Sequence, residues 1–289
     1  MPLPDPVQTC PYDRIVADEF RFGIGVMRGT SRRQLHDFAR QAEDLGYDVV
    51  HVPDHLGGPA PFPVMTALAM ATSTLRVGTF VLNAAFYRPA LLTRDVTALH
   101  DVSEGRLDLG LGTGYVKEEF DAAGIPFPSA GARVEHLRDT CAYLAEHAPD
   151  VPIMIAGNGD RVLRIAARMA DIVGLTGGDR APDADEDPLA DRIAFVRDAA
   201  GDRFDALELN IAVTAMPLDG SGMPDLTIPR HFLPGLSDDE LLRHPGVLSG
   251  SAADMADRIR SYRDRYGISY VTVQDRHAEA FGEVIARLK

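Results

Sequence analysis

The feature that most constrains the fold is a regular alternation of strand-like and helix-like segments along nearly the whole chain. Ser31 can cap the first helix, which ends at Gly46. Eight segments have the strand pattern, at residues 22–26, 48–52, 76–82, 106–111, 152–156, 172–175, 207–215 and 269–273. Eight such units in 289 residues, with no break in composition, predict a single (β/α)8 barrel. A doubly wound sheet is the alternative, but eight sequential units would make an unusually wide open sheet.

The predicted domain organisation is a mostly irregular lead-in at residues 1–20 followed by one barrel domain at 21–289. Residues 117–148 hold a short helix, a proline-rich kink and a longer helix. Helices are also predicted at 63–73, 90–102, 161–169, 189–200, 251–266 and 278–288. The longest irregular stretch, 216–250, follows the seventh strand, and a loop of that length in a compact domain is usually a lid or a binding loop.

The fourth strand ends in three glycines spaced two apart, Gly110, Gly112 and Gly114. A strand without side chains at its end leaves backbone N–H groups bare, so a flat or anionic ligand can approach closely. The dinucleotide fingerprint has a different third spacing and opens directly into a helix, which excludes that interpretation. In a barrel, loops after strands carry the site, so this motif predicts ligand contact.

Two more strands end in small residues. The turn 156–161 (Ala-Gly-Asn-Gly-Asp-Arg) opens a helix whose N-terminus could hold a phosphate or a carboxylate; the simpler interpretation is a tight turn capped by Asp160. Thr176, Gly177 and Gly178 form a third loop of this kind. Because strand ends meet at one face of a barrel, the three loops are predicted to converge on one anionic group.

The second strand runs into Asp54 and His55, which are candidates for acid–base chemistry or for cofactor contact. His51 lies four residues before His55, a spacing that also suits a metal site. Metal-binding barrels collect ligands from several strands, and no matching cluster occurs at the other strand ends, so no metal is predicted. The alternative role for Asp54 and His55 is purely structural.

Three other kinds of site, for calcium, for a serine nucleophile and for a Schiff-base lysine, have weaker support in the sequence. The acidic run at 183, 185 and 187 resembles half a calcium loop, but Pro188 follows where glycine is needed, so we interpret it as a solvated loop. The chain has no G-x-S-x-G motif, which removes the usual signature of a serine hydrolase. The lysines are Lys117 and Lys289, and neither is placed at a predicted strand end, although Lys117 closely follows the fourth strand.

Composition restricts the partners and the compartment. A net charge of −14 argues against nucleic acid and anionic membranes, because no positive field would gather phosphates. No segment has the apolar length of a membrane span, and the N-terminus lacks the pattern of a signal peptide. Cys10 and Cys141 lie far apart, as expected for reduced thiols, so a cytoplasmic location is predicted.

In this order, several segments resemble the luciferase-like monooxygenase family, the bacterial-luciferase superfamily of flavin and deazaflavin barrels. The matching segments are 22–26, 46–55, 75–83, 88–90, 103–106, 110–114, 152–157 and 170–174. Within the family, the chain is more similar to the branch that uses the 5-deazaflavin coenzyme F420 than to FMN luciferases. The short length, the Asp54-His55 pair and Gly112-Thr113-Gly114 carry this resemblance.

The resemblance implies a site in the barrel mouth. The tricyclic ring of the cofactor would lie against a bulge in the third strand, with a cis peptide bond between Phe80 and Val81. Asp54 and His55 would be catalytic. The implied cofactor contacts are Asp54, Thr79, Phe80, Val81, Asn83, Gly112, Thr113, Gly114, Tyr115, Ala156, Gly157, Asn158, Gly159, Thr176, Gly177 and Gly178. Tyr115 stands where the sugar-phosphate dehydrogenases of the family have a glutamate that acts as an acid, which argues against sugar-phosphate oxidation.

The predicted function is therefore hydride transfer between coenzyme F420 and a small organic substrate, in a protein expected to be a homodimer. One alternative is an FMN-dependent monooxygenase that receives reduced flavin from a partner reductase. Another is a barrel that binds flavin or a partner subunit without catalysis. A sugar-phosphate isomerase or aldolase would need a metal set or a Schiff-base lysine, for which Lys117 is the nearest candidate.

Overall fold

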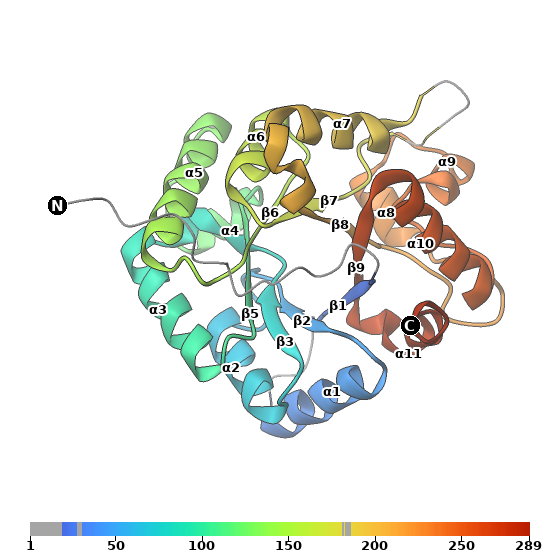
Figure 1. The fold of residues 1–289 in the computed structure, drawn as a ribbon, viewed down its shortest axis with the longest axis horizontal. Helices are drawn as coiled ribbons and strands as arrows, with labels where there is room; N and C mark the ends of the chain where they lie inside the picture. Colours follow the sequence, from blue (N-terminus) through green and yellow to red (C-terminus); the bar gives the residue numbers. More distant parts are fainter. Residues whose placement is uncertain (1–18, 28–30, 181, 183–185) are drawn as a thin grey trace.

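The strands of the protein form one parallel sheet that closes into a barrel. The computed structural model describes residues 19–27, 31–180, 182 and 186–289. The strand order is β3-β2-β1-β9-β8-β7-β6-β5-β4, and β3 also pairs with β5. Figure 1 shows the strands inside a ring of helices, as predicted for a (β/α)8 barrel. The strands are β1 (Arg21–Gly25), β2 (Val49–Val52), β3 (Arg76–Thr79), β4 (Leu82–Asn83), β5 (Leu107–Gly112), β6 (Ile153–Ala156), β7 (Ile172–Leu175), β8 (Glu208–Ala212) and β9 (Ile268–Gln274).

The helices begin and end near the predicted positions. The first one begins after Ser31, whose hydroxyl accepts a hydrogen bond from the backbone N–H of Gln34 in a capping box. The helices are α1 (Arg32–Asp44), α2 (Pro61–Ala71), α3 (Pro89–Val102), α4 (Lys117–Ala122), α5 (Ala130–His147), α6 (Asp160–Met169), α7 (Pro188–Ala200), α8 (Thr227–Phe232), α9 (Asp238–Arg243), α10 (Ala252–Tyr266) and α11 (Ala278–Leu288).

The interior of the barrel is filled by side chains. Val49, Met154, Ile172 and Tyr270 pack together there, with Phe80 and Val81 against them. Ion pairs add a charged layer: Arg21 contacts Asp108 and Glu208, and Arg76 also contacts Asp108. A packed interior is normal for this fold and leaves only the ends of the barrel for a site.

The third strand differs from its prediction as one continuous segment, 76–82. It is interrupted at Phe80 and Val81, which are joined by a cis peptide bond, and resumes as β4. At the interruption, the hydroxyl of Thr79 donates to the carbonyl of Gly110 at 2.8 Å and accepts from its N–H at 2.9 Å. One side chain thus satisfies both backbone groups of Gly110 where the ladder between the strands is broken.

The three spaced glycines of β5 and its loop fit this broken strand. A Cβ atom on Gly110 would lie 2.0 Å from the Thr79 carbonyl oxygen, and one on Gly112 would lie 2.8 Å from a Val81 methyl. A Cβ on Gly114, where φ is +68°, would lie 2.2 Å from the Asn83 side-chain oxygen. The sequence motif was interpreted as space for a ligand, but the glycines first make room for the chain's own third strand.

Replacing Gly110 with alanine is therefore expected to destabilise the fold by roughly 3 kcal/mol, the upper end of what overpacking costs, because the clash is with backbone. Gly235→Ala is the matched control, since a Cβ there meets nothing within 4 Å; surface changes of that kind alter stability by less than about 0.5 kcal/mol. Urea unfolding followed by circular dichroism measures both. Equal unfolding midpoints for the two variants would contradict this account of the glycine motif.

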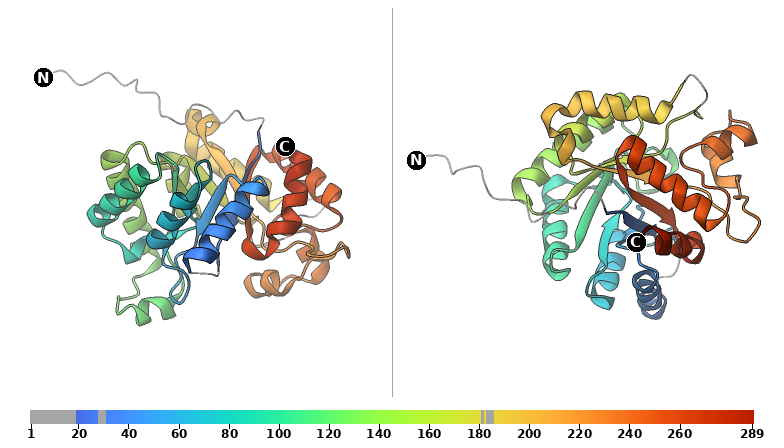
Figure 2. Two further views of the ribbon diagram at one scale, coloured as in Figure 1. Left: turned by 90° about the horizontal axis from the view of Figure 1, so that it is seen from below. Right: turned by 45° about the vertical axis from the view of Figure 1, so that its right-hand side comes forward.

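The segment after β8, residues 216–250, is not irregular throughout as predicted. It contains α8 and α9, which lie with α4 at one end of the barrel in the left view of Figure 2. Its small core of Leu226, Leu241 and Val247 packs against Ala215, and the N–H of Thr214 donates to the carbonyl of Gly246 at 2.8 Å. Each helix has six residues, too few for a helical repeat of apolar positions to be recognised.

Some predictions fall partly outside the described residues. These are the lead-in up to residue 18, Cys10, and positions 183 and 185 of the acidic run; Phe20, at the end of the lead-in, is buried and stacks on Phe22. Cys141 is buried as a free thiol, and burial raises its pKa to about 12. No helix in the part of the chain that the structure describes has the length and apolarity needed to cross a membrane.

Candidate functional site

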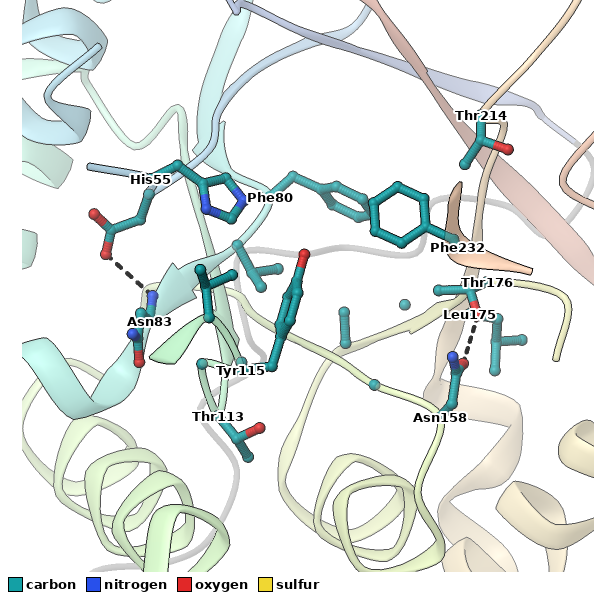
Figure 3. A pocket seen from close by; sticks show the side chains of 18 of the residues that line it. His55, Phe80, Asn83, Thr113, Tyr115, Asn158, Leu175, Thr176, Thr214 and Phe232 are labelled. Carbon is teal, nitrogen blue, oxygen red and sulfur yellow. Dashed lines mark hydrogen bonds between the residues drawn. The ribbon is translucent and has the colours of Figure 1, made fainter. Parts of the chain in front are cut away.

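A cavity of about 530 Å³ opens where the strands end, and most of the predicted site residues line it (Figure 3). Ligand pockets of small molecules have this size. The predicted residues that line it are Asp54, His55, Phe80, Val81, Asn83, Gly112, Thr113, Gly114, Tyr115, Ala156, Gly157, Asn158, Thr176 and Gly178. They come from the ends of β2, β3, β5, β6 and β7, so separate sequence motifs meet in one place.

Three predicted contact residues do not line the cavity. Thr79 is the last residue of β3 and is fully buried, with its hydroxyl bonded to Gly110. Gly159 precedes the first turn of α6 as its N-cap. Gly177, at a φ of +90°, packs against His244; a Cβ there would lie 2.8 Å from the imidazole. Thr79 and Gly177 thus shape the site from behind, whereas Gly159 is exposed beside the cavity.

Asp54 is a nearly buried carboxylate at the edge of the cavity, with 9% of its surface exposed. It accepts a hydrogen bond from the backbone N–H of Asn83 at 3.1 Å, drawn in Figure 3, and another from the hydroxyl of Tyr87. Burial raises the pKa of Asp54, although both hydrogen bonds act in the opposite direction. Asp54 thus ties the loop after β2 to the resumed third strand.

His55 has a carboxylate partner that the sequence analysis missed. Its Nδ1 lies 2.8 Å from Oε1 of Glu119 on α4, and its ring meets the ring of Tyr115 edge-on, with centroids 6.4 Å apart. An ionised carboxylate only accepts, so Nδ1 is the donor. This leaves Nε2 of His55 available to take or give a proton. Glu119 lies four residues after Tyr115. By the resemblance, it is the position of Tyr115, not that of Glu119, at which the sugar-phosphate dehydrogenases have their glutamate.

The opposite side of the cavity carries small residues and a helix end. Gly157 and Asn158 lead into α6, and the side-chain oxygen of Asn158 accepts from the hydroxyl of Thr176 at 2.5 Å. Around Gly159 there is open space, since a Cβ would meet nothing within 4 Å. A second cavity of about 390 Å³ shares Asn158 and Gly178 with the first and is otherwise lined by Asp179, Arg180, Pro188, Asp191 and Arg192, so its two arginines stand beside two carboxylates. The small residues and the N-terminus of α6 are the features of this side that could hold a phosphate.

The segment 216–250 contributes a part of the cavity wall that was not predicted. Pro229, Phe232 and Leu233 come from α8 and the residue after it, and His244 follows α9. No motif marks these residues, so only the fold reveals them. Leu82, Val116, Glu119, Gly174, Leu175 and Thr214 are the other lining residues that the sequence analysis did not name.

The residues considered for a metal site and for a Schiff-base lysine, His51 and Lys117, do not line the cavity. His51 is fully buried inside the barrel, where its Nε2 pairs with the hydroxyl of Tyr270, and burial together with Arg21 lowers its pKa to about 3. Lys117 is exposed on α4 and pairs with Asp121. Over the residues that can be described, no group of three or more metal-binding side chains comes together.

The fold and the site define a (β/α)8 barrel with a pocket at the ends of its strands, built from loops that follow several of them. The chain belongs to the luciferase-like monooxygenase family, whose sequence profile matches residues 15–219. This confirms the resemblance seen in the sequence.

Individual members of the family share less than a third of their residues with this chain in the two comparisons that follow. The chain is 26% identical over 243 residues to a 5,10-methylenetetrahydromethanopterin reductase of Methanolobus tindarius, covering 73% of this chain and 74% of the relative. It is 30% identical over 179 residues to an F420-dependent glucose-6-phosphate dehydrogenase of Amycolatopsis mediterranei, covering 50% and 54%. The chain thus spans only about half the length of some of its relatives.

Among solved structures, an F420-dependent secondary alcohol dehydrogenase in complex with an F420-acetone adduct superimposes with a TM-score of 0.74. The superposition covers 94% of this chain and 99% of the other at 16% identity. At that identity the likeness shows the shared fold.

Proposed function

We propose that this protein is an oxidoreductase that transfers a hydride between coenzyme F420 and a small organic substrate. The observation that carries the proposal is the cavity of about 530 Å³, which the His55–Glu119 pair shares with residues at the ends of β5, β6 and β7. The similarity to an F420-dependent glucose-6-phosphate dehydrogenase, and the fold shared with an F420-dependent secondary alcohol dehydrogenase, support the choice of cofactor. The homodimer remains a prediction, as does a partner reductase for the FMN alternative.

The residues of the cavity fit such a cofactor. Phe80 and Val81 offer an apolar surface for a flat ring, and Gly112 and Gly114 line the same cavity. The open space at Gly159, before the first turn of α6, suits the phosphate of a side chain, because the N–H groups there lack helical partners. When bound, a deazaflavin supplies a carbon that accepts or donates a hydride.

The protein's own part is to position the substrate and to move one proton. His55 can exchange a proton through Nε2 with an oxygen of the substrate while Glu119 holds Nδ1 and stabilises the imidazolium form. Asp54 fixes the loop that carries His55 through its bond to Asn83. Pro229 and Phe232 cover one side of the cavity and reduce the access of water.

We expect the purified protein to bind coenzyme F420 more tightly than FMN, because the Asp54-His55 pair and the Gly112–Gly114 loop resemble the deazaflavin branch. Quenching of cofactor fluorescence in parallel titrations measures both dissociation constants. Affinity for FMN at least tenfold stronger than for F420 would reject the proposal and favour the monooxygenase. Affinity for neither would favour a barrel without this cofactor chemistry.

A further inference from the structure

The charges around the cavity indicate which substrates it can accept. No lysine or arginine lies among the described residues that line it, and two carboxylates do, Asp54 and Glu119. The charge of a protonated His55 is compensated by Glu119 at 2.8 Å. A dianionic phosphate on the substrate would therefore be desolvated next to negative charge without a matching cation.

His244 does not supply the missing positive charge. It is buried, its Nδ1 accepts from the N–H of Gly246 at 3.0 Å, and its Nε2 donates to the carbonyl of Gly178 at 3.3 Å. These bonds use both ring nitrogens in the neutral form, and burial lowers the pKa of His244. The imidazole therefore acts as a neutral wall of the cavity.

The outer part of the cavity is instead rich in aromatic and aliphatic surface. Tyr115 and Phe232 are 65% and 58% exposed, although both are large rings. In Figure 3 their side chains project into the same cavity, Tyr115 from the loop after β5 and Phe232 from the end of α8. Exposed aromatic rings that converge in a pocket gain free energy when a flat apolar group lies between or against them.

We propose that the substrate is an uncharged molecule with an aromatic ring, held by Tyr115 and Phe232, and that phosphorylated sugars are excluded. This inference rests on the proposed function for the reaction, but the ligand preference itself follows from the lining of the cavity. Val116 and Leu233 extend the same apolar wall on either side. Phe232 is then the residue that selects for the ring.

A titration with a matched pair of probes tests the proposal. Protein loaded with coenzyme F420 is titrated with acetophenone, with 4-acetylbenzoate, which is the same molecule carrying a carboxylate, and with glucose 6-phosphate, using calorimetry. Acetophenone is expected to bind at least about tenfold more tightly than 4-acetylbenzoate, because a carboxylate in the cavity would be desolvated without a partner. Glucose 6-phosphate is expected to bind more weakly than acetophenone.

Two variants of the protein test whether Phe232 itself, rather than any exposed apolar side chain of the same segment, contacts the probe. Phe232→Ala is expected to weaken the binding of acetophenone about tenfold, while the affinity for F420 stays within twofold. Met223→Ala is the control, since Met223 is 57% exposed in the same segment but does not line the cavity. The proposal is overturned if either anionic probe binds as tightly as acetophenone, or if Phe232→Ala and Met223→Ala bind acetophenone equally.

The two proposals fail separately in this design. Absence of F420 binding in the loading step would reject the proposed function. The same titrations on cofactor-free protein would still decide between a neutral aromatic ligand and a charged one, because Tyr115 and Phe232 belong to the protein's own lining of the cavity.

Discussion

Replacing His55 with asparagine is expected to slow the transfer of hydride by about a hundredfold to ten-thousandfold, the usual contribution of a general acid or base. The fold and most of the cofactor affinity should remain, because the imidazole is partly exposed and its hydrogen bond goes to Glu119. Single-turnover measurements of cofactor absorbance, with a substrate that the unmodified protein converts, give the rate of the bound enzyme. Fluorescence titration of the same variant gives the cofactor affinity.

Two further variants distinguish proton transfer from positioning. Glu119→Gln keeps an acceptor for Nδ1 of His55 but removes the charge that stabilises the imidazolium, so its rate should fall less than that of His55→Asn. Asp54→Asn should chiefly weaken cofactor binding, since Asp54 bonds to the backbone of Asn83 and to Tyr87. If His55→Asn loses affinity and keeps its single-turnover rate, His55 is only a binding residue.

The barrel could be predicted from the sequence because its buried strands appear as short apolar segments that alternate with helical ones. The glycines of β5 lie where the pattern placed them, and the cis peptide bond between Phe80 and Val81, which the resemblance to the family implied, is present. The interruption of the third strand was not evident from hydrophobic pattern, since Thr79 replaces a ladder contact through its hydroxyl. A threonine in a strand pattern gives no sign of such a bond until its neighbour, Gly110, is known.

The site was predictable only where residues follow strands directly. Asp54 and His55 come at the end of β2, so the rule for barrel loops located them. Glu119 is 64 positions from His55 in the chain and reaches it only because α4 folds over the end of the barrel. Phe232 belongs to a six-residue helix in a segment with no strand or motif beside it. Contacts of this kind depend on the packing of loops, which sequence periodicity does not describe.

The second large effect is expected at acidic pH and originates inside the barrel. His51 has a pKa of about 3 in the folded protein, because burial and the charge of Arg21 disfavour its protonation. In the unfolded chain its pKa is near 6.5. Between these two pH values the folded state thus binds fewer protons than the unfolded chain. The free energy of unfolding is therefore at its full value above pH 6.5 and decreases as the pH falls toward 3.

Within this window, His51 alone lowers the free energy of unfolding by about 1.4 kcal/mol for each unit by which the pH falls. His277 adds to it in the same direction, since burial lowers its pKa to about 4. Urea unfolding at pH 7 and pH 5 measures the change. The ring of His51 fills the space left by Gly23 and Gly78, where a Cβ would lie within 3.0 Å of it, so substitution also costs stability at neutral pH.

The diagnostic quantity is therefore the difference in unfolding free energy between the two pH values, not the stability at either one. His51→Gln removes the titrating group while its amide can still reach the hydroxyl of Tyr270, so this difference should shrink by about 1.5 to 2 kcal/mol. Met70→Ala, at an exposed position on α2, serves as the control because it removes no titrating group, and it should leave the difference unchanged. An unaltered pH dependence in His51→Gln would show that the buried imidazole does not govern acid unfolding, and that the ion pairs of Asp108 and Glu208 with Arg21 are the groups to test next.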